Sequence, residues 1–472
     1  MRRPLPLFLA LPLVLSLALL AACTTVGPDY RRPDVPLPGS FQGAPVDEPR
    51  LAADWWKAFG DATLDGLVAS ALQGNADLRA AAARIQEAEA VLREAGAAYF
   101  PEITAGTGYS RTHVSRRVLP PPPGNVTFTR PLYQVTASTS FEIDFWGRFA
   151  RASEAAQSGL LAARYSRDVV AMTLASAVAQ SYFALRSLDA QSAVLARSLQ
   201  ARSDALDLAK ARLKAGFAPE LDVFQAQGAL SDALVQKREA DRQRSVVERQ
   251  LAQLAATPDL RLPAGDLFLL PLAPVPPAGL PSSLLQRRPD IRAAEESLVA
   301  ANAQICAARA AMFPAISLTG TLGSQSALFS NLLGGGAGIW SLGFGLALPL
   351  FDAGRREARV DQASARERQA VAGYQRAVET AFREVSESLI NVSQSGATEA
   401  DLEARLKAAR GALELSILRY EAGYSPFLEV LDAQRTANDA EVAFVRNRQA
   451  RLSYSVDLLK ALGGGWSDPS PR

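Results

Sequence analysis

The second half of this chain repeats its first half at a spacing of about 210 residues. Residues 77–103 and 290–316 align without a gap and share 12 identities in 27 positions. A second block repeats as clearly, with RLKAGFAPEL at 212–221 and RYEAGYSPFL at 419–428. Solenoid repeats have periods of about 20–50 residues, so this repeat is too long to be a solenoid unit. We infer that a half-molecule was duplicated and that each half supplies the same set of elements.

The N-terminus has the layout of an export signal. Arg2 and Arg3 precede an apolar run over 5–20, and small residues then lead to Cys23 in the sequence LAAC. This ending resembles a bacterial lipobox, which implies cleavage before Cys23 and attachment of lipid to that cysteine. Because residue 24 is Thr rather than Asp, the resemblance implies the outer membrane as the destination. The alternative is an ordinary signal peptide with a chance cysteine.

Few residues in the mature chain could support catalysis or metal binding. Cys306 is the only cysteine besides Cys23, so no internal disulfide is expected, and its Ala-rich helical setting predicts a small core residue. His113 is the only histidine, which argues against a histidine-based triad and a Cys/His zinc site. The net charge of +2 does not favour a nucleic-acid partner. We therefore expect no enzyme activity, no cofactor and no metal.

Each half contains two segments that alternate between apolar and polar residues, as β-strands do. We expect the strands at about 102–112, 132–145, 315–324 and 339–350. Ten-residue strands with bulky apolar residues on one face are typical of a transmembrane β-barrel, although a soluble sandwich gives the same alternation. The export signal favours the barrel. After residue 24 no segment has 18 uninterrupted apolar residues, so we expect no membrane-spanning helix.

A long helical hairpin follows each pair of strands. The helical patterns cover about 150–215 and 355–422, and partner helices return over about 220–256 and 427–462. At ~1.5 Å per residue each long helix would reach roughly 100 Å, which far exceeds a globular domain. Each hairpin turns at an Ala-Gly-aromatic-x-Pro sequence, where Gly supplies a left-handed turn and Pro starts the next helix. An earlier helix is expected from near Thr63, capped by Asp61, to about Phe100.

These patterns define the predicted organisation of the chain. We expect a signal peptide at 1–22, an extended lipidated tether at 23–54, a first repeat at 55–262, a Pro-rich linker at 263–282, a second repeat at 283–463 and a C-terminal tail at 464–472. Four strands cannot close a barrel, and an open sheet would leave unpaired backbone groups in lipid. Two copies would give eight strands and three would give twelve. Only the larger number leaves a water-filled lumen, so we favour three copies.

Several short motifs, taken in order, resemble those of the TolC-like outer-membrane factors, in particular their lipoprotein branch, the OprM/NodT-like efflux channels. They are GPDY at 27–30, WWKAF at 55–59, RRPDIR at 287–292, LPLFDAGR at 348–355 and LEVLDAQR at 428–435. The resemblance covers essentially all of the mature chain. It implies a mixed α and β membrane protein: a homotrimer that shares one 12-stranded outer-membrane barrel continued by a periplasmic α-helical barrel. It also implies a periplasmic adaptor and an inner-membrane pump, commonly of the resistance-nodulation-division type.

The same resemblance implies a gate where the hairpins converge at the periplasmic tip. It assigns an apolar ring to Leu428, carboxylate rings to Glu429 and Asp432, a constriction to Tyr420 with Arg419, and an acidic partner on the neighbouring hairpin to Asp222. Threefold crowding of carboxylates would raise their pKa values and attract cations. The alternatives are a solvated helix face for Glu429 and Asp432, and a helix-start acid for Asp222. Ser425 replaces an arginine of the TolC branch, and Arg419 is a candidate substitute for it.

The hairpin tips are where the resemblance places the contact with the adaptor. The residues concerned are Gly216, Phe217, Pro219, Gly423, Tyr424 and Pro426. Turn formation alone would also explain these residues, and both interpretations can hold together. The leading functional hypothesis is a passive duct that exports small molecules. The alternatives are a TolC-type protein-secretion duct and a non-conducting structural coiled-coil lipoprotein of the envelope.

Overall fold

The structure is a computed structural model of the whole chain, and it describes residues 26–41, 51–115, 117, 129–279 and 281–467. Cys23 and the predicted signal peptide therefore lie outside the described residues.

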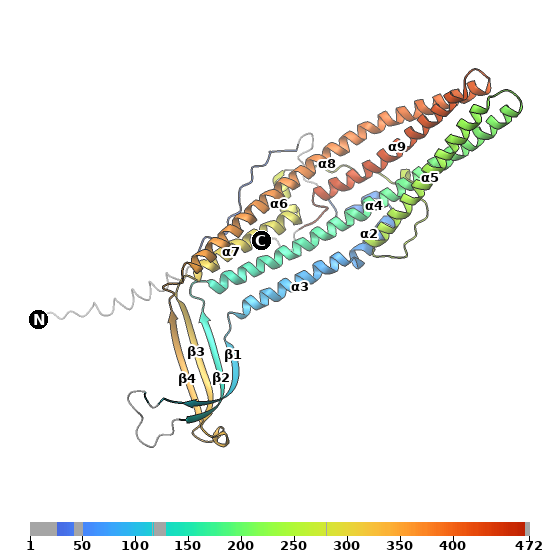
Figure 1. Cartoon of the computed structure of the whole chain (residues 1–472). Helices are drawn as coiled ribbons and strands as arrows, with labels where there is room; N and C mark the ends of the chain where they lie inside the picture. The colour runs from blue at the N-terminus through green and yellow to red at the C-terminus, as the bar shows by residue number, and fades with distance from the viewer. Residues whose placement is uncertain (1–25, 42–50, 116, 118–128, 280, 468–472) are drawn as a thin grey trace. The chain divides into compact units, whose positions relative to one another are not determined.

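The two repeats contain matching sets of elements (Figure 1). The first has η1 (Trp55–Phe59), α2 (Ala62–Gly74), α3 (Ala76–Ala97), β1 (Glu102–His113), β2 (Thr129–Ile143), α4 (Arg148–Lys214) and α5 (Glu220–Leu254). Short 3-10 helices η2 (Leu267–Leu269) and η3 (Pro281–Ser283) follow. The second has α6 (Leu284–Arg287), α7 (Pro289–Ala310), β3 (Ala315–Ser326), η4 (Phe329–Asn331), β4 (Gly338–Ala347), α8 (Arg355–Glu421) and α9 (Phe427–Ala461). Helices α8 and α9 begin at 355 and 427, each 207 residues after α4 and α5 begin at 148 and 220.

The single helix predicted from Thr63 to Phe100 is in fact two helices that meet at Asn75. Asp61 caps the first, as predicted, and accepts hydrogen bonds from the backbone N–H groups of Thr63 and Leu64 at 2.7 and 3.1 Å. Asn75 has extended backbone angles, and its side chain accepts a hydrogen bond from the N–H of Asp77 at 2.8 Å. Asn is a favoured N-cap residue, so Asn75 ends α2 and starts α3. Helical periodicity missed this break because the residues on both sides keep a helical pattern.

The chain forms two compact units, and both units contain parts of both repeats. Unit 1 comprises Met1–Pro33, Ile85–Ala162 and Ala294–Gly373, and unit 2 comprises Asp34–Arg84, Ala163–Ala293 and Tyr374–Arg472. The duplicated halves therefore do not fold as separate domains.

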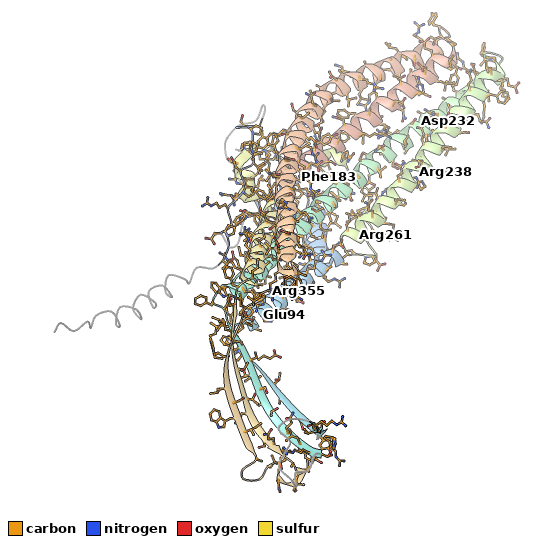
Figure 2. All side chains as sticks on the ribbon, turned by 60° about the vertical axis from the view of Figure 1, so that its left-hand side comes forward. Glu94, Phe183, Asp232, Arg238, Arg261 and Arg355 are labelled. Carbon is orange, nitrogen blue, oxygen red and sulfur yellow. The ribbon has the colours of Figure 1, made fainter. Side chains whose placement is uncertain are left out.

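Unit 1 is built around one antiparallel sheet with the strand order β1-β2-β3-β4. Figure 1 shows β1 and β4 at its two edges. Helices adjoin the strands at one end of the sheet, where Figure 2 shows Glu94 of α3 and the first residue of α8, Arg355. Strand β1 ends and β2 begins at the other end, where the turn from β3 to β4 also lies.

The strand register places the apolar positions of all four strands on one face. Tyr109 lies opposite Tyr133, Ala137 lies opposite Leu322, and Leu322 lies opposite Trp340. The bulky side chains on this face are exposed: 75% for Trp340, 82% for Leu342 and 69% for Phe344. The opposite face carries small and polar residues, such as Ser138, Thr321 and Ser341. A sheet with an apolar outer face and a polar inner face is the arrangement of a membrane barrel wall.

The bounds of β2 and β4 differ from the prediction. Strand β2 begins at Thr129 and ends at Ile143, and β4 ends at Ala347 although the alternation continues to Leu350. Pro349 lacks a backbone N–H, so the chain cannot continue a regular ladder there. The alternation of apolar and polar residues therefore continues past the last paired residue of β4.

The core of unit 2 combines both repeats with the segments that precede them. Trp55 and Phe59 of η1 pack with Tyr182 and Phe183 of α4, and Leu452 of α9 belongs to the same cluster. Helix α4 includes an 18-residue window that could cross a membrane by length and composition, and 44% of this window is buried in the structure. Because α4 supplies completely buried side chains to this core, packing accounts for its apolar composition. The sequence test required an uninterrupted apolar run and therefore did not detect this window.

Candidate functional site

The first hairpin turns through a glycine in the left-handed conformation. Gly216 has φ of 77°, and glycine adopts this conformation without steric cost. The N–H of Phe217 donates to the carbonyl of Arg212 at 2.8 Å, and the N–H of Gly216 donates to the carbonyl of Leu213 at 3.0 Å. These two bonds form a Schellman motif, which satisfies the last carbonyls of α4. Pro219, with φ of −75°, then caps α5 rather than occupying its first turn.

The second hairpin repeats this geometry closely. Gly423 has φ of 80°, the N–H of Tyr424 donates to the carbonyl of Arg419 at 2.8 Å, and Pro426 caps α9 with φ of −73°. Phe217 is 81% exposed and Tyr424 is 80% exposed. Each tip therefore presents one aromatic side chain, which the turn itself does not need.

Tyr420 connects the two hairpins near their tips. Tyr420 is only 6% exposed, and its ring lies 5.1 Å from the ring of Phe427. The guanidinium group of Arg212, from the first hairpin, lies 4.6 Å from the centre of the Tyr420 ring and donates to the Tyr420 carbonyl at 2.8 Å. This combines a cation–π contact with a charge-assisted hydrogen bond. The sequence prediction missed Arg212, although the repeat aligns it with Arg419.

The predicted gate acids are exposed and form ion pairs within the chain. Glu429 lies 3.3 Å from the Nε atom of Arg419, and Asp432 lies 2.8 Å from Arg435. Their side chains are 42% and 65% exposed. Both carboxylates are therefore exposed to solvent in one chain, and each is paired with an arginine, Arg419 or Arg435.

Asp222 of the first hairpin lies close enough to Arg212 to feel its charge. Burial raises the pKa of Asp222, and the positive charge of Arg212 partly offsets this effect. Among the described residues, Arg419 pairs with Glu429, whereas Asp222 faces the charge of Arg212. Leu428, the predicted apolar ring position, is 61% exposed. The structure thus brings Arg212, Tyr420 and Asp222 into one neighbourhood.

Residues 26–32 of the predicted extended tether make specific contacts within unit 1. The N–H of Val26 donates to the carbonyl of Trp146 at 3.3 Å, and the thiol of Cys306 donates to the carbonyl of Pro28 at 3.4 Å. Gly27 has φ of 112°, and a Cβ atom there would lie 2.5 Å from the sulfur of Cys306. Only glycine therefore fits between the segment and α7. Cys306 is buried, as predicted, and it also shapes this contact.

Ion pairs fix the same segment further along. Asp29 lies 2.6 Å from Arg151 of α4, and Arg32 makes two hydrogen bonds to Glu295 of α7 at 2.7 and 2.9 Å. Tyr30 also donates to Glu295 at 3.3 Å. The GPDY motif at 27–30 therefore locks the N-terminal segment onto two helices, a role that its sequence did not reveal.

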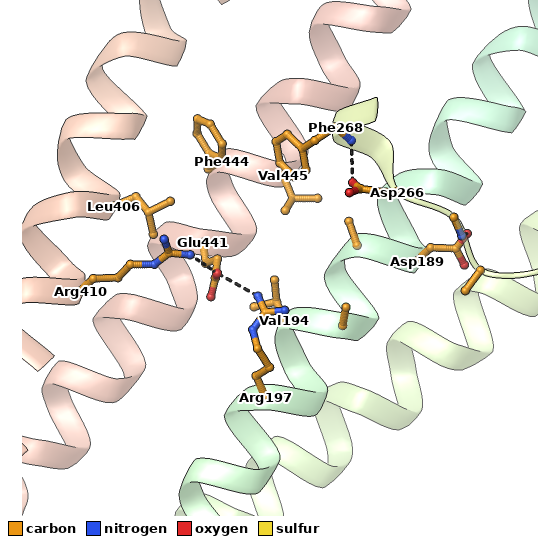
Figure 3. Close-up of a pocket in the computed structure, with 14 residues that line it drawn as sticks. Asp189, Val194, Arg197, Asp266, Phe268, Leu406, Arg410, Glu441, Phe444 and Val445 are labelled. Atoms are coloured by element: carbon orange, nitrogen blue, oxygen red, sulfur yellow. Dashed lines mark hydrogen bonds and ion pairs between the residues drawn. The ribbon is translucent and has the colours of Figure 1, made fainter. Parts of the chain in front are cut away.

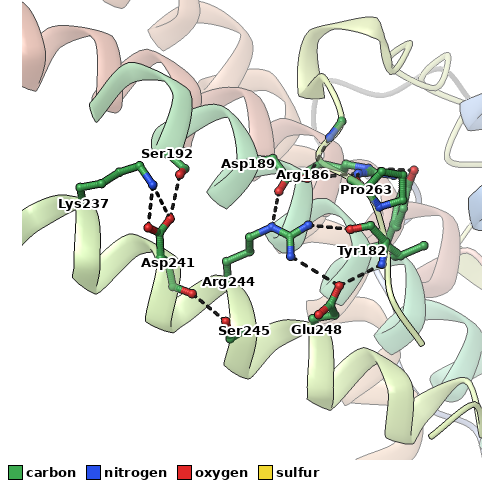
Figure 4. Close-up of polar contacts among 12 residues, drawn as sticks. Tyr182, Arg186, Asp189, Ser192, Lys237, Asp241, Arg244, Ser245, Glu248 and Pro263 are labelled. Carbon is green, nitrogen blue, oxygen red and sulfur yellow. Dashed lines mark hydrogen bonds and ion pairs between the residues drawn. The ribbon is translucent and has the colours of Figure 1, made fainter. Parts of the chain in front are cut away.

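A buried polar cluster fastens the linker between the repeats to the first hairpin (Figure 4). The carboxylate of Asp189, whose side chain is 1% exposed, accepts from Arg186 at 3.1 Å, from Arg244 at 2.6 Å and from the N–H of Gly265 at 3.1 Å. Arg186 also donates to the carbonyl of Pro263 at 2.7 Å. The cluster thus joins α4, α5 and the linker through satisfied hydrogen bonds.

Tyr182 and Asp61 extend this cluster to the start of α2. The hydroxyl of Tyr182 donates to Asp61 at 2.6 Å and accepts from Arg186 at 3.0 Å. Burial and the bond to Asp61 raise the pKa of Tyr182 to about 12. Burial opposes ionisation of Asp61, but hydrogen bonds from Tyr182 and two backbone N–H groups outweigh it and lower the pKa of Asp61. Both groups keep their ordinary protonation states, which suits a structural role.

A cavity of about 590 Å³ lies beside this cluster in unit 2 (Figure 3). In its wall, Glu441 of α9 pairs with Arg197 of α4 at 2.9 Å and also with Arg410 of α8. The stacked rings of Phe268 and Phe444, 5.6 Å apart, line another side. In the part of the chain that the structure describes, no group of three or more His, Cys, Asp and Glu residues could hold a metal. The charges in this wall neutralise one another and hold helices together.

The comparison with protein families decides the identity of this fold. The sequence matches the family model described as outer membrane efflux protein over residues 67–257 and 280–464, one match in each repeat. The chain belongs to this family. The toluene efflux pump outer membrane protein TtgF of Pseudomonas putida is 35% identical over 482 residues, which cover 98% of both chains. Outer membrane protein OprJ of Pseudomonas aeruginosa is 36% identical over 464 residues, covering 96% of this chain and 95% of OprJ.

Solved structures agree with this assignment. The outer-membrane channel OprN matches with a TM-score of 0.86 and 29% identity, covering 94% of this chain and all of that chain. The open state of the MtrE outer membrane channel of Neisseria gonorrhoeae matches with a TM-score of 0.82 and 30% identity, covering 94% and 98%. The predicted family, fold class, outer-membrane location and role in efflux are thereby confirmed. The family consists of channel proteins rather than enzymes.

Proposed function

We propose that three copies of this chain form one passive duct that exports small molecules across the outer membrane. The observation that carries this proposal is the sheet of unit 1. Its apolar face continues across all four strands, while its edge strands β1 and β4 have no further strand partner among the described residues. Unpaired strand edges are not tolerated in lipid, so further copies must complete the wall. Twelve strands enclose a water-filled lumen.

The names of the relatives support small apolar molecules as the cargo. They include a toluene efflux pump protein, a solvent efflux pump protein and an antibiotic efflux pump protein. A protein-secretion duct is the alternative. The two are distinguished in a strain that lacks its own outer-membrane efflux component: this chain, with its cognate adaptor and pump, should restore tolerance to toluene. Secretion of a protein without any gain in tolerance would support the alternative.

The partners of the duct are a periplasmic adaptor and an inner-membrane pump of the resistance-nodulation-division type. The exposed aromatic side chains of Phe217 and Tyr424 support adaptor contact at the hairpin tips, since both stand clear of the turn hydrogen bonds. Gly216, Pro219, Gly423 and Pro426 then fix the shape of these tips. Replacing both aromatic residues by Ser should abolish co-purification of the adaptor.

The lipid anchor is the second attachment to the membrane. Val26 is held at Trp146, beside the end of the sheet, and Cys23 is three residues away in sequence. Lipid on Cys23 would therefore start at the level where the strands leave the membrane. Cys23→Ala should abolish metabolic labelling with palmitate, and continued labelling would exclude this site.

The gate is tested by conductance of the purified protein in planar bilayers. Leu428, Glu429 and Asp432 would narrow the tip, with Tyr420, Arg419, Arg212 and Asp222 holding the hairpins together. Removing the carboxylates in Glu429→Gln/Asp432→Asn should lower cation preference and raise single-channel conductance about twofold or more. The matched control is Asp439→Asn, an exposed acid further along α9. Unchanged conductance and selectivity would contradict carboxylate rings at the gate.

A further inference from the structure

The charges of the membrane-embedded part of the chain are confined to one end and have one sign. Between Ile103 and Phe141 the sequence contains four arginines and no Asp or Glu, and residues 315–351 contain no charged residue at all. The arginines are Arg111, Arg116, Arg117 and Arg130, which in the sequence lie near the end of β1 or the start of β2. Strand β1 ends and β2 begins at the end of the sheet that is remote from the helices, and the proposed barrel places this end at the cell surface.

Aromatic side chains gather near both ends of the sheet. Toward the cell surface, the ring of Tyr133 lies 4.7 Å from Tyr109 and 5.6 Å from Phe329. Toward the periplasm, the ring of Trp146 stacks on Phe313 at 4.6 Å. The strand between these two clusters would span about 30 Å of membrane at a tilt of about 40°. Tyr and Trp rings favour the level of the lipid headgroups.

Arg111 lies just beyond the aromatic boundary on the lipid-facing side. It is two residues after Tyr109 and pairs with Pro131, as Tyr109 pairs with Tyr133, so both side chains share the apolar face. Arg111 is exposed, and no ion pair to it occurs in the described part of the chain. Arg117, after the end of β1, is also exposed. The guanidinium group of Arg111 therefore stands at headgroup level, and β1 and β2 carry no acid between Ile103 and Phe141 that could neutralise it.

We propose that Arg111 and Arg117 bind the phosphate groups of the glycolipid that forms the outer leaflet of the outer membrane. Guanidinium groups bind phosphate through paired, charge-assisted hydrogen bonds, and each cation near an anionic lipid surface strengthens binding. Because Arg111 lies on the lipid-facing side of the sheet, its ligand is expected to be a lipid rather than a cargo molecule in the lumen. Arg130 provides the contrast, because it pairs with Thr112 and so lies on the opposite, lumen-facing side. This inference rests on the proposed barrel but not on the gate.

Binding of lipid A to the purified, detergent-solubilised protein tests the proposal. Native mass spectrometry would compare lipid A that carries two phosphates with the same lipid after dephosphorylation. Arg111→Gln/Arg117→Gln should weaken binding of the phosphorylated lipid about tenfold, and Arg111→Lys/Arg117→Lys should retain most of it. The matched control Arg130→Gln should change binding less than about twofold. Inorganic phosphate in millimolar excess should not displace the lipid.

The opposite results would overturn the proposal. These are equal binding of both lipid forms, unchanged binding by Arg111→Gln/Arg117→Gln, or an equal loss in Arg130→Gln. The number of chains per particle in the same mass spectra shows whether each variant has assembled, and planar-bilayer conductance tests the duct separately. A chain that binds the lipid but does not conduct would contradict the proposed duct and leave the lipid site standing.

Discussion

Single residues decide how the hairpins of this chain meet, and Arg212 shows this most clearly. It contacts both the ring and the carbonyl of Tyr420, although the sequence motifs pointed to Arg419. The repeat placed Arg212 and Arg419 at equivalent positions, so either could have been chosen. Which one crosses to the other hairpin depends on packing between helices that are about 200 residues apart, and local sequence does not contain that information.

Asp457 is a residue whose ionisation opposes folding. Burial raises its pKa, the charge of Glu384 adds to this effect, and Lys460 and a hydrogen bond from Gln180 at 2.6 Å work against it. The folded state therefore binds this proton more tightly than the unfolded state, so stability is lost as pH rises from the unfolded value of 3.8 through the folded pKa.

Asp457→Asn should consequently be more stable than the wild type at neutral pH. We expect the melting temperature, followed by circular dichroism at the helix band, to rise by about 1–3 °C at neutral pH. The difference should vanish below about pH 4, where the wild-type carboxyl group is protonated. A rise that persists at low pH would show that ionisation is not its cause.

At the scale of elements, the two hairpins have matched lengths but different attachments. Asp189 fastens α4 to the linker between the repeats, whereas the position 207 residues later is Gly396. The lengths follow from the repeat and the turn glycines, and these were predictable. The buried cluster was not, because its partners, such as Arg244 and Gly265, come from separate segments. Asn75 likewise interrupts a helical pattern that looked continuous.

Asp189→Ala should destabilise the helical part of the protein. It would leave Arg186 buried without its carboxylate partner, and the loss of one member of a buried ion pair costs about 3 kcal/mol. The melting temperature should fall by about 5 °C or more. Asp241 is the matched control, since it pairs with Lys237 but its side chain is 49% exposed. Asp241→Ala should cost less than about 1 kcal/mol, and equal effects of the two substitutions would contradict a buried clamp.

At the scale of the whole molecule, the duplication and the strand alternation were enough to predict an oligomeric membrane duct. The apolar positions from Trp340 to Phe344 do lie on one exposed face, as the alternation indicated. Sequence could not show that the compact units would cut across the repeats, because that depends on pairing between β2 and β3. It also did not show which residues hold the segment 26–32, since its partners Arg151 and Glu295 are distant in sequence.

In the proposed duct, this chain completes a barrel only with copies of itself. The most direct test is the native mass of the purified, detergent-solubilised complex, measured after mild removal of detergent. Three chains per particle are predicted, because twelve strands close a wall that still leaves a lumen. A particle of one or two chains, stable across protein concentrations, would contradict the account.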